Sequence, residues 1–448
     1  MTESQIYYNK MTKTPLTKLI VSLGIPTTIS MLVTNIYNMA DTYFVGTLGE
    51  SQQAATGILF TLQAIIQAIA FMLGQGSGTM VSKALADQNE EEASEYVSSA
   101  FYLGLGIGTV LMVGGLLFLS PFMRLLGSTE TILPYAKQYG FCVSITSPIM
   151  MASFVLNNNL RYEGKAFYAM IGLVTGGLLN IFGDYLFVIV LERGVLGAGI
   201  ATALSQVVSF LILLYFHGKM AQSKIRISSI SKKLSVYGTI SRVGFPAVIR
   251  QGLSSVSSGL LNNLTRPYGD AAIAAMSVVN RFSAFIMCVG LGVGQGYQPV
   301  ASFNYQAKEY KRVKKGLLVT MAIGFCFISC LAIPGVIFAE EVIHLFQESE
   351  KVKEVGVFAM RCSCIGTIFL AFSVPVNMLY QSIRKAGISS FLSMLRSGLM
   401  FIPTLIITTH FLGITGIQIS QPLADMLTGF ASIPFVISFL SKKFDEKK

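Results

Sequence analysis

Charged residues are scarce in this sequence, where they make up only 12% of 448 residues. A soluble protein carries about 25% charged residues, so half of that figure leaves too few charges to cover a water-facing surface. Hydrophobic residues reach 52%, and the mean hydropathy is +0.62. A soluble enzyme or a soluble binding domain is therefore excluded.

Side chains that bind metals or act as nucleophiles are also few, and they are dispersed. Only three histidines occur, and none of the six cysteines has the paired spacing of a zinc site. The cysteines lie in or beside apolar runs, where we expect them to be small buried hydrophobic side chains. We expect no cofactor, no metal cluster and no catalytic triad, and hence no enzyme. The net charge of +11 does not indicate a nucleic-acid partner, because lysine and arginine gather in loops.

Long uncharged apolar runs recur along the chain and predict transmembrane helices. They are too long and too uniformly apolar for the strands of a membrane barrel, so all of them are predicted to be helical. Twelve spans are predicted, at residues 16–45, 53–80, 96–119, 133–157, 166–190, 197–217, 239–265, 271–299, 315–338, 354–379, 387–409 and 416–440. The polar start of the chain and the length of the first apolar run predict no cleaved signal peptide.

The basic residues predict the orientation of these spans. They concentrate before span one and after spans two, four, six, eight and ten, above all in 219–233 and 308–315. If the spans are right, all of these segments lie on one side of the membrane. The positive-inside rule then predicts a multi-pass protein of the cytoplasmic membrane with both termini in the cytoplasm.

The two halves of the sequence resemble each other at an offset of 220 residues (Gly24 and Gly244), with a small slip in the matches that begin at Arg161 and Gly194. The matches occur in one order: Gly24-Ile25-Pro26 with Gly244-Phe245-Pro246, Gly49 with Gly269, Gly74-Gln75-Gly76 with Gly294-Gln295-Gly296, Arg161-x-x-Gly164 with Arg384-x-x-Gly387, and Gly194-x-x-Gly197 with Gly413-x-x-Gly416. A series in one order indicates duplication, with six spans in each half.

An even number of spans returns the chain to the same side, so both halves insert in the same orientation. The predicted fold is therefore an all-α membrane protein, with twelve transmembrane helices in two six-helix lobes related by a pseudo-two-fold axis along the membrane normal. The lobes are predicted at 1–218 and 239–448, and residues 219–238 form the cytoplasmic linker. Transporters built this way carry their substrate between the lobes.

Acids at membrane depth are costly and mark functional sites. The first half holds Asp41 and Asp184. The repeat counterpart of Asp41 is Leu261, and that of Asp184 falls within 403–407, which holds no acid. The second half can therefore fold without them. Its own candidate is Asp425 in span twelve, which has no evident partner in the sequence.

Asp41, Asp184 and Thr202 are predicted at a common depth of about 8–10 Å below the outer surface, at 1.5 Å per residue. Asn180 and Asp184 are spaced i, i+4 and share a helix face. Two carboxylates, one amide oxygen and one hydroxyl suit H⁺ or Na⁺, and two close carboxylates tend to share one proton. The alternative is that each acid only hydrogen-bonds a neighbouring helix.

Pro26 lies inside span one and is predicted to kink it, either as a hinge or as a passive kink. Arg250 and Arg281 lie within spans seven and eight, with Asn280 beside the second of them. They could line a cavity, Arg281 could pair with an acid of the first lobe, or the arginines could extend to the membrane interface.

Motifs in four spans carry a resemblance to a known family. They are Asn35-x-Tyr37-Asn38-x-x-Asp41-Thr42-x-Phe44-x-Gly46, Leu160-Arg161-x-Glu163-Gly164, Asn180-x-x-x-Asp184-x-x-Phe187 and Gly194-x-x-Gly197-Ala198-Gly199-x-Ala201-Thr202. Together they resemble the multidrug and toxic compound extrusion (MATE) family, in its prokaryotic DinF-like branch. The likeness covers nearly the whole chain.

The resemblance implies alternating access and the export of organic cations or amphipathic compounds by antiport with H⁺ or Na⁺. It also implies that Asp41, Asn180, Asp184 and Thr202 form the cation-coupling site, which would ligate the metal if Na⁺ is used. Tyr37 and Asn38 of the first motif are further candidates for lining the cavity, as are the three polar residues of spans seven and eight. The expected partners are small-molecule drugs or toxic organic cations and membrane lipid, and we expect a monomer.

Two further branches of this superfamily predict different sites. One places acids in the second lobe, on spans seven and ten, where this chain offers no acid at mid-depth. The other is a flippase for a lipid-linked saccharide, which remains the alternative function. There Arg250 and Arg281 would bind a phosphate-bearing lipid.

Overall fold

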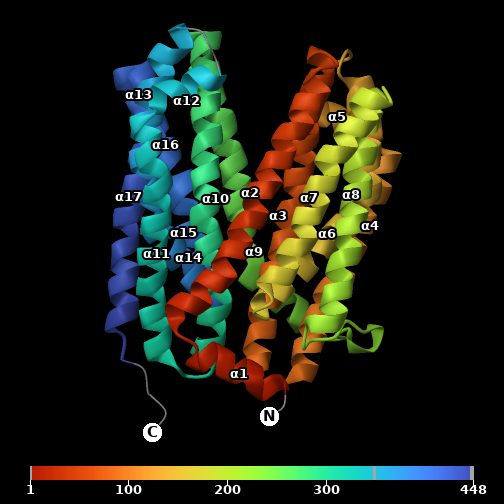
Figure 1. Cartoon of the computed structure of the whole chain (residues 1–448), viewed down its shortest axis with the longest axis vertical. Coiled ribbons are helices and arrows are strands. Elements are labelled where there is room, and N and C mark those ends of the chain that lie inside the picture. The colour runs from red at the N-terminus through yellow and green to blue at the C-terminus, as the bar shows by residue number, and fades with distance from the viewer. Residues whose placement is uncertain (1–2, 347–349, 444–448) are drawn as a thin grey trace. The chain divides into compact units, whose positions relative to one another are not determined.

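The computed structural model describes residues 3–346 and 350–443, and every regular element in these ranges is a helix (Figure 1). The first half contains α1 (Glu3–Lys13), α2 (Leu16–Gly46), α3 (Glu50–Ala86), α4 (Glu90–Leu117), α5 (Leu119–Leu125), α6 (Leu133–Tyr162), α7 (Ala166–Asp184), the π-helical turn η1 (Tyr185–Val190) and α8 (Gly194–Met220). The second half contains η2 (Ile227–Ser229), α9 (Leu234–Thr265), η3 (Arg266–Tyr268), α10 (Asp270–Gln306), α11 (Tyr310–Ile337), α12 (Ala339–Phe346), α13 (Glu350–Thr367), α14 (Leu370–Ser382), α15 (Ala386–Met394), the π-helical turn η4 (Leu395–Met400), α16 (Phe401–Leu412) and α17 (Ile414–Ser441).

All twelve predicted spans fall on helices, which confirms the all-α membrane class. Within the described residues, ten helices are long and apolar enough to cross a membrane, and the bent pair α13 and α14 raises the number to eleven. The remaining predicted span is α9, which is long enough but less apolar. Its second half carries Arg250 and a series of serines and asparagines, so composition alone does not identify it as a span.

Several helices run further than the apolar pattern predicts. The helix α3 continues to Ala86 and α10 continues to Gln306, while α4 already begins at Glu90 and α11 at Tyr310. All four ends face loops that the sequence predicts to be cytoplasmic. A helix satisfies its own backbone hydrogen bonds, so it can extend past its apolar stretch into the polar interface and beyond.

Three predicted spans are interrupted. Span ten is divided into α13 and α14, which are bent by 45° at the break. Spans five and eleven each contain a π-helical turn, η1 after Asp184 and η4 around Arg396. Single π-helical turns inside α-helices occur frequently at functional sites. Here both turns adjoin a charged side chain that lies within a span.

Contacts divide the chain into two compact units. Unit 1 comprises Met1–Tyr8 and Ile29–Val248, and unit 2 comprises Asn9–Thr28 and Ile249–Lys448. Residues 1–2, 347–349 and 444–448, which the predicted lobes include, lie outside the described residues. Within unit 1, α6 packs against α3, α4 and α8, and within unit 2, α10 packs against α11, α13 and α14 (Figure 1).

Two helices change unit along their length. The helix α2 leaves unit 2 for unit 1 just after Pro26, and α9 leaves unit 1 for unit 2 just after Pro246. The two prolines are repeat counterparts. Unit 2 therefore contains the first part of α2, although the rest of α2 lies in unit 1. Unit 1 likewise contains the first part of α9, although the rest of α9 lies in unit 2.

The repeated glycines allow close packing at these helix starts. In unit 2, a Cβ atom at Gly296 of α10 would lie 2.5 Å from the Cα atom of Gly24 on α2. In unit 1, a Cβ atom at Gly76 of α3 would lie 3.2 Å from the backbone nitrogen of Gly244 on α9. The motifs Gly-x-Pro and Gly-Gln-Gly thus pack on each other twice, because glycine is needed where two backbones approach this closely.

The predicted linker 219–238 is held by side chains of unit 1. The Glu163 carboxylate, just after α6, accepts a hydrogen bond from the backbone nitrogen of Gln222 at 2.6 Å. The Ser94 hydroxyl of α4 accepts one from the backbone nitrogen of Lys224 at 2.9 Å. The start of the linker is therefore an ordered part of this unit.

The expectation for the cysteines is wrong at two positions. Cys142, Cys288 and Cys364 are buried and Cys362 is half-buried, but Cys326 and Cys330 are exposed on α11. A thiol on the surface of an apolar transmembrane helix contacts lipid as readily as protein, so its hydrophobic character does not require burial in the protein.

Candidate functional site

The four polar residues predicted to act together gather inside unit 1. Asp41 comes from α2, Asn180 and Asp184 come from α7, and Thr202 comes from α8. All four are buried, with exposed fractions of 4% or less. Their oxygen atoms belong to three helices that converge in one compact unit.

A tyrosine that the sequence did not single out joins these residues. The Tyr139 hydroxyl of α6 donates to Asp41 Oδ2 at 2.9 Å and lies 3.0 Å from Thr202 Oγ1. Asn180 Nδ2 donates to the same Thr202 oxygen at 3.1 Å. A continuous polar network therefore connects α2, α6, α8 and α7.

Four acceptor atoms of the predicted site have no hydrogen-bond partner among the described residues. They are Asp41 Oδ1, Asn180 Oδ1 and both carboxylate oxygens of Asp184, and all of them are buried. Buried polar groups nearly always have partners, and a buried charge without compensation is strongly unfavourable. The site thus has an excess of oxygen acceptors and a shortage of positive charge.

Glycines of α7 bring the acids close to the neighbouring helices. A Cβ atom at Gly183 would lie 2.9 Å from Cβ of Ala201 on α8, and one at Gly177 would lie 3.1 Å from the Tyr37 ring on α2. Small residues allow such close approach between transmembrane helices. The glycines on either side of Asn180 therefore set the distance at which α7 presents its polar face.

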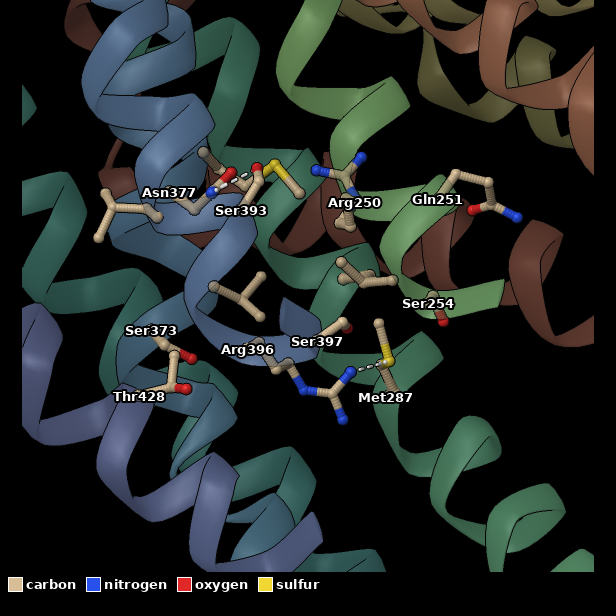
Figure 2. Close-up of a pocket in the computed structure, with 14 residues that line it drawn as sticks. Arg250, Gln251, Ser254, Met287, Ser373, Asn377, Ser393, Arg396, Ser397 and Thr428 are labelled. Carbon is tan, nitrogen blue, oxygen red and sulfur yellow. Dashed lines mark hydrogen bonds between the residues drawn. The ribbon is translucent and has the colours of Figure 1, made fainter. Parts of the chain in front are cut away.

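The other candidates for a cavity are placed in different surroundings. Tyr37 and Asn38 are half-buried on α2, in unit 1. Arg250 lines a pocket of unit 2 (Figure 2). Asn280 is half-buried, Arg281 is exposed, and neither lines that pocket. The two arginines that the flippase alternative requires therefore do not meet there.

The expectation that Asp425 has no partner is wrong. Its Oδ1 accepts hydrogen bonds from Arg396 Nε at 2.8 Å and from Gln421 Nε2 at 2.9 Å, and its exposed fraction is 1%. Arg396 lies in η4, within the predicted span eleven. Helix packing brings these residues together across 29 positions of sequence, which no local pattern indicates.

Tyr139 could have been identified from its depth. It lies six residues after the outer start of the predicted span 133–157, which corresponds to about 9 Å at 1.5 Å per residue. This is the depth predicted for Asp41, Asp184 and Thr202. A tyrosine hydroxyl at membrane depth requires a polar partner, which is a usable signal.

No group of three or more His, Cys, Asp and Glu side chains in the described ranges could hold a metal ion. The network of unit 1 instead offers two carboxylates, an amide and two hydroxyls. This donor set lacks the clustered carboxylates of a resident divalent metal site but fits a monovalent cation or a proton.

The chain is similar throughout its length to known transporters. The profile of the MatE family matches residues 26–186 and again residues 246–407, so its two matches follow the internal repeat. The multidrug export protein MepA of Staphylococcus aureus strain NCTC 8325 is 24% identical over 438 residues, which is 97% of this chain and 96% of the relative.

Solved structures give the same result. The structure of a MATE protein in complex with MaL6 matches with a TM-score of 0.92 and 25% identity, over 99% of this chain and 100% of that one. The outward-facing conformation of a multidrug resistance MATE family transporter of the MOP superfamily matches with a TM-score of 0.90 and 26% identity, over 97% and 98%. Because the family profile covers well over half of the sequence, in both of its halves, this chain belongs to the MatE family of multi-pass membrane transporters and is not an enzyme.

Proposed function

We propose that this chain is a secondary active multidrug efflux transporter that exports organic cations or amphipathic compounds in exchange for H⁺ or Na⁺. The observation that carries the proposal is the set of buried acceptor atoms in unit 1 without hydrogen-bond partners among the described residues. A transporter that couples its cycle to a cation needs a site that is incomplete without that cation.

The coupling cation would bind between α2, α7 and α8. A proton would be held by Asp41 or Asp184, and Na⁺ would take oxygens from Asp41, Asn180, Asp184 and Thr202, since it prefers hard oxygen ligands. The Tyr139 hydroxyl already donates to Asp41 and would orient that carboxylate toward the cation. Binding of either cation would compensate one of the two negative charges of the site.

The coupling of this charge change to movement would run through α2. Asp41 lies on the part of α2 that belongs to unit 1, while the start of the helix belongs to unit 2. The change of unit falls just after Pro26, where the helix lacks a backbone hydrogen bond. This supports Pro26 as the hinge of the transport cycle.

Antiport requires that the cation and the drug favour different states. A cationic drug that is attracted by the same carboxylates as H⁺ or Na⁺ would meet this requirement. The carboxylates cannot hold the drug and the coupling cation at the same time. Multidrug export is also what the name of the similar MepA protein states.

We place the chain in the DinF-like branch, because the two acids, the asparagine and the threonine of that branch's site are all present. We further propose that both termini are cytoplasmic, that the six-span lobes at 1–218 and 239–448 are the moving parts, and that the transporter works as a monomer in the cytoplasmic membrane. The basic loops and the even number of predicted spans support the orientation.

The test is transport of ethidium by the full chain in liposomes, under an imposed H⁺ or Na⁺ gradient. Asp41→Asn is compared with the wild type and with Glu130→Gln, an exposed acid of the same unit. Coupling free energies correspond to about 5–150-fold effects, so gradient-driven transport should fall by at least about tenfold in Asp41→Asn and stay unchanged in Glu130→Gln.

The ion whose gradient drives wild-type transport is the coupling ion. Transport that survives in Asp41→Asn would remove this residue from the coupling site. Absence of transport under both gradients would overturn the efflux proposal for cationic drugs.

A further inference from the structure

Unit 1 contains an open hollow between the start of α4 and the linker that follows α8 (Figure 1). Its volume is about 580 Å³, within the range of about 300–1,000 Å³ that small-molecule sites occupy. All of its lining residues lie in 90–95 and 222–233. The hollow is therefore formed by one helix start and one loop of the same unit, and its lining contains no residue of the cation site.

Serines of α4 hold the linker against this helix. The Ser98 hydroxyl accepts a hydrogen bond from the backbone nitrogen of Arg226 at 3.1 Å, and the Ser99 hydroxyl accepts one from the backbone nitrogen of Ser231 at 2.9 Å. They continue the contact that Ser94 makes with the start of the linker. The loop is thus an ordered wall of the hollow and lies at a fixed place opposite α4.

The two walls of the hollow carry opposite charges. The start of α4 contributes three acids, Glu90, Glu91 and Glu95, and the linker contributes four basic residues. Among the residues that the structure describes, no ion pair joins the acids to the bases. Walls of opposite charge that do not pair with each other leave space between them for a ligand that carries both signs.

One of the basic residues already has partners of its own. The Lys224 ammonium donates to the backbone oxygens of Ala221 at 2.8 Å and Gly218 at 3.1 Å, at the end of α8. A cation is stabilised at this end of a helix by the helix dipole. The other basic residues of the lining are Arg226, Lys232 and Lys233. Three basic side chains then face three acids, so the ligand that compensates both walls carries no net charge.

The chemistry of the walls identifies the two ends of this ligand. Arginine and lysine bind phosphate oxygens through charge-assisted hydrogen bonds. Carboxylates only accept hydrogen bonds, so the cationic end needs N–H donors. A quaternary ammonium has no such donor and is bound by aromatic side chains, which the described lining of the hollow does not contain. A phosphate joined to a primary ammonium therefore fits both walls.

Two observations favour a membrane lipid over a soluble zwitterion. The predicted span of α4 begins at residue 96, directly after Glu95, so the acidic wall lies at the level of the lipid head groups. Ile227 and Leu234 adjoin the basic residues of the linker and expose 74% and 84% of their surface. Exposed apolar side chains beside basic ones are typical of segments that contact the membrane interface.

We infer that this hollow binds the head group of an aminophospholipid of the phosphatidylethanolamine type, with its phosphate against the linker and its ammonium against α4. Such a lipid is neither a drug nor the coupling cation of the proposed function. Its binding needs no ion gradient and none of the acids of the cation site, so it can be measured without transport.

The chain contains no tryptophan, so Ile227→Trp gives a single fluorescence signal beside the hollow. The full chain is placed in phosphatidylcholine nanodiscs that contain a minor fraction of brominated phosphatidylethanolamine, phosphatidylcholine or phosphatidylglycerol. Bromine quenches a tryptophan that it approaches. Quenching should show at least about threefold tighter binding of the ethanolamine lipid than of the choline lipid, because several exposed charge pairs each contribute modestly. Leu234→Trp provides a second reporter.

Removal of the acidic wall tests the ammonium contact. Glu91→Gln combined with Glu95→Gln should abolish the preference for ethanolamine over choline and increase the binding of phosphatidylglycerol, because the basic wall then acts alone. Glu130→Gln removes an exposed acid of the same unit that does not line the hollow, and it should leave the preference unchanged.

Removal of the basic wall tests the phosphate contact. Arg226→Gln combined with Lys232→Gln should weaken the binding of the ethanolamine lipid to the level of the choline lipid. Lys219→Gln is the matched control, because Lys219 is an exposed base of the same linker that does not line the hollow. It should leave the preference for ethanolamine over choline unchanged.

Equal quenching by the ethanolamine and choline lipids with both reporters would overturn the inference. Strongest binding of phosphatidylglycerol by the protein with both walls intact would show a basic patch and would also overturn it. Soluble phosphoethanolamine that removes the preference would overturn the choice of a lipid. Asp41→Asn should lose gradient-driven transport and keep the lipid preference, so failure of the proposed function and failure of this inference are distinguishable.

Discussion

The two units hold buried polar centres of different composition. In unit 1, Asp41 and Asp184 bring two carboxylates together with more acceptors than donors. In unit 2, the buried carboxylate of Asp425 is paired with Arg396 and accepts a further hydrogen bond from Gln421. One duplicated sequence has thus produced an acceptor-rich centre in one unit and a paired arginine and carboxylate in the other.

Neither centre has a counterpart in the other half. Leu261 replaces Asp41 in the repeat and is buried in unit 2. The repeat counterparts of Arg396 fall within 173–177, which holds no charged residue. The glycines at the helix crossings, by contrast, occur in both halves. Backbone packing therefore tolerates little change, while the charges that it surrounds have diverged.

The largest expected difference concerns the ion pair of unit 2. Arg396→Met leaves the carboxylate of Asp425 buried without its charged partner, and breaking a buried pair in this way costs about 3–5 kcal/mol of unfolding free energy. The double variant Arg396→Met with Asp425→Leu removes both charges and should recover most of the loss. The measurement is denaturant-induced unfolding in detergent. A double variant no more stable than the single one would contradict this account of the pair.

A smaller effect is expected at Glu163, the other buried acid of unit 1, whose repeat counterpart is Ala386. Burial raises the pKa of the Glu163 carboxyl to about 7, although hydrogen bonds from Ser223 and Gln222 act against this rise. The folded protein then holds a proton that the unfolded chain, with a pKa of 4.5, releases. Stability should therefore be greatest below about pH 4.5 and fall by up to about 3 kcal/mol as the pH rises to about 7.

Glu163→Gln should remove this part of the pH dependence. The measurement is the unfolding midpoint of the wild type and of Glu163→Gln at pH 5 and at pH 7.5. The control is Glu130→Gln, which removes an exposed acid. If the wild type instead gained stability relative to Glu163→Gln between pH 5 and pH 7.5, the hydrogen bonds would outweigh the effect of burial on the pKa of Glu163.

The smallest effect, and one of opposite sign to that of Arg396, is expected at Asp184. Its carboxylate oxygens are buried without hydrogen-bond partners among the described residues, and such a group costs about 1–3 kcal/mol. Asp184→Asn should therefore raise the unfolding free energy by about 1 kcal/mol in the absence of Na⁺ near neutral pH. Asn180→Ala, which also removes a polar group of α7 but breaks a hydrogen bond, should lower it. A less stable Asp184→Asn would mean that the carboxylate is already compensated.

Much of the architecture could be predicted from local patterns. Each predicted span lies on a helix, because apolar runs of this length have few other ways to satisfy their backbone in lipid. Helical spacing placed Asn180 and Asp184 on one helix face. The distance of Asp41 and Thr202 from the ends of their spans placed these two residues at a common depth. The helix ends were less accurate, because polar turns continue a helix without any apolar signal.

The partners of the charged residues could not be predicted in the same way. Tyr139 reaches Asp41 across 98 positions of sequence, and Arg396 reaches Asp425 across 29. Such contacts depend on which helix faces meet, and on interruptions such as η4 that rotate a side chain relative to a regular helix. A hydropathy pattern contains no information of this kind.

By itself, the sequence determined the membrane class, the succession of helices, the duplication and the residues that can carry charge within the membrane. The reason is that lipid imposes the same local requirement on every span, which each span must meet alone. Only the tertiary structure decided which of those residues meet, where α2 and α9 change unit, and that the acids of unit 1 lack donors while Asp425 of unit 2 is paired with Arg396. These features depend on packing between distant helices, which small residues such as glycine allow to approach closely.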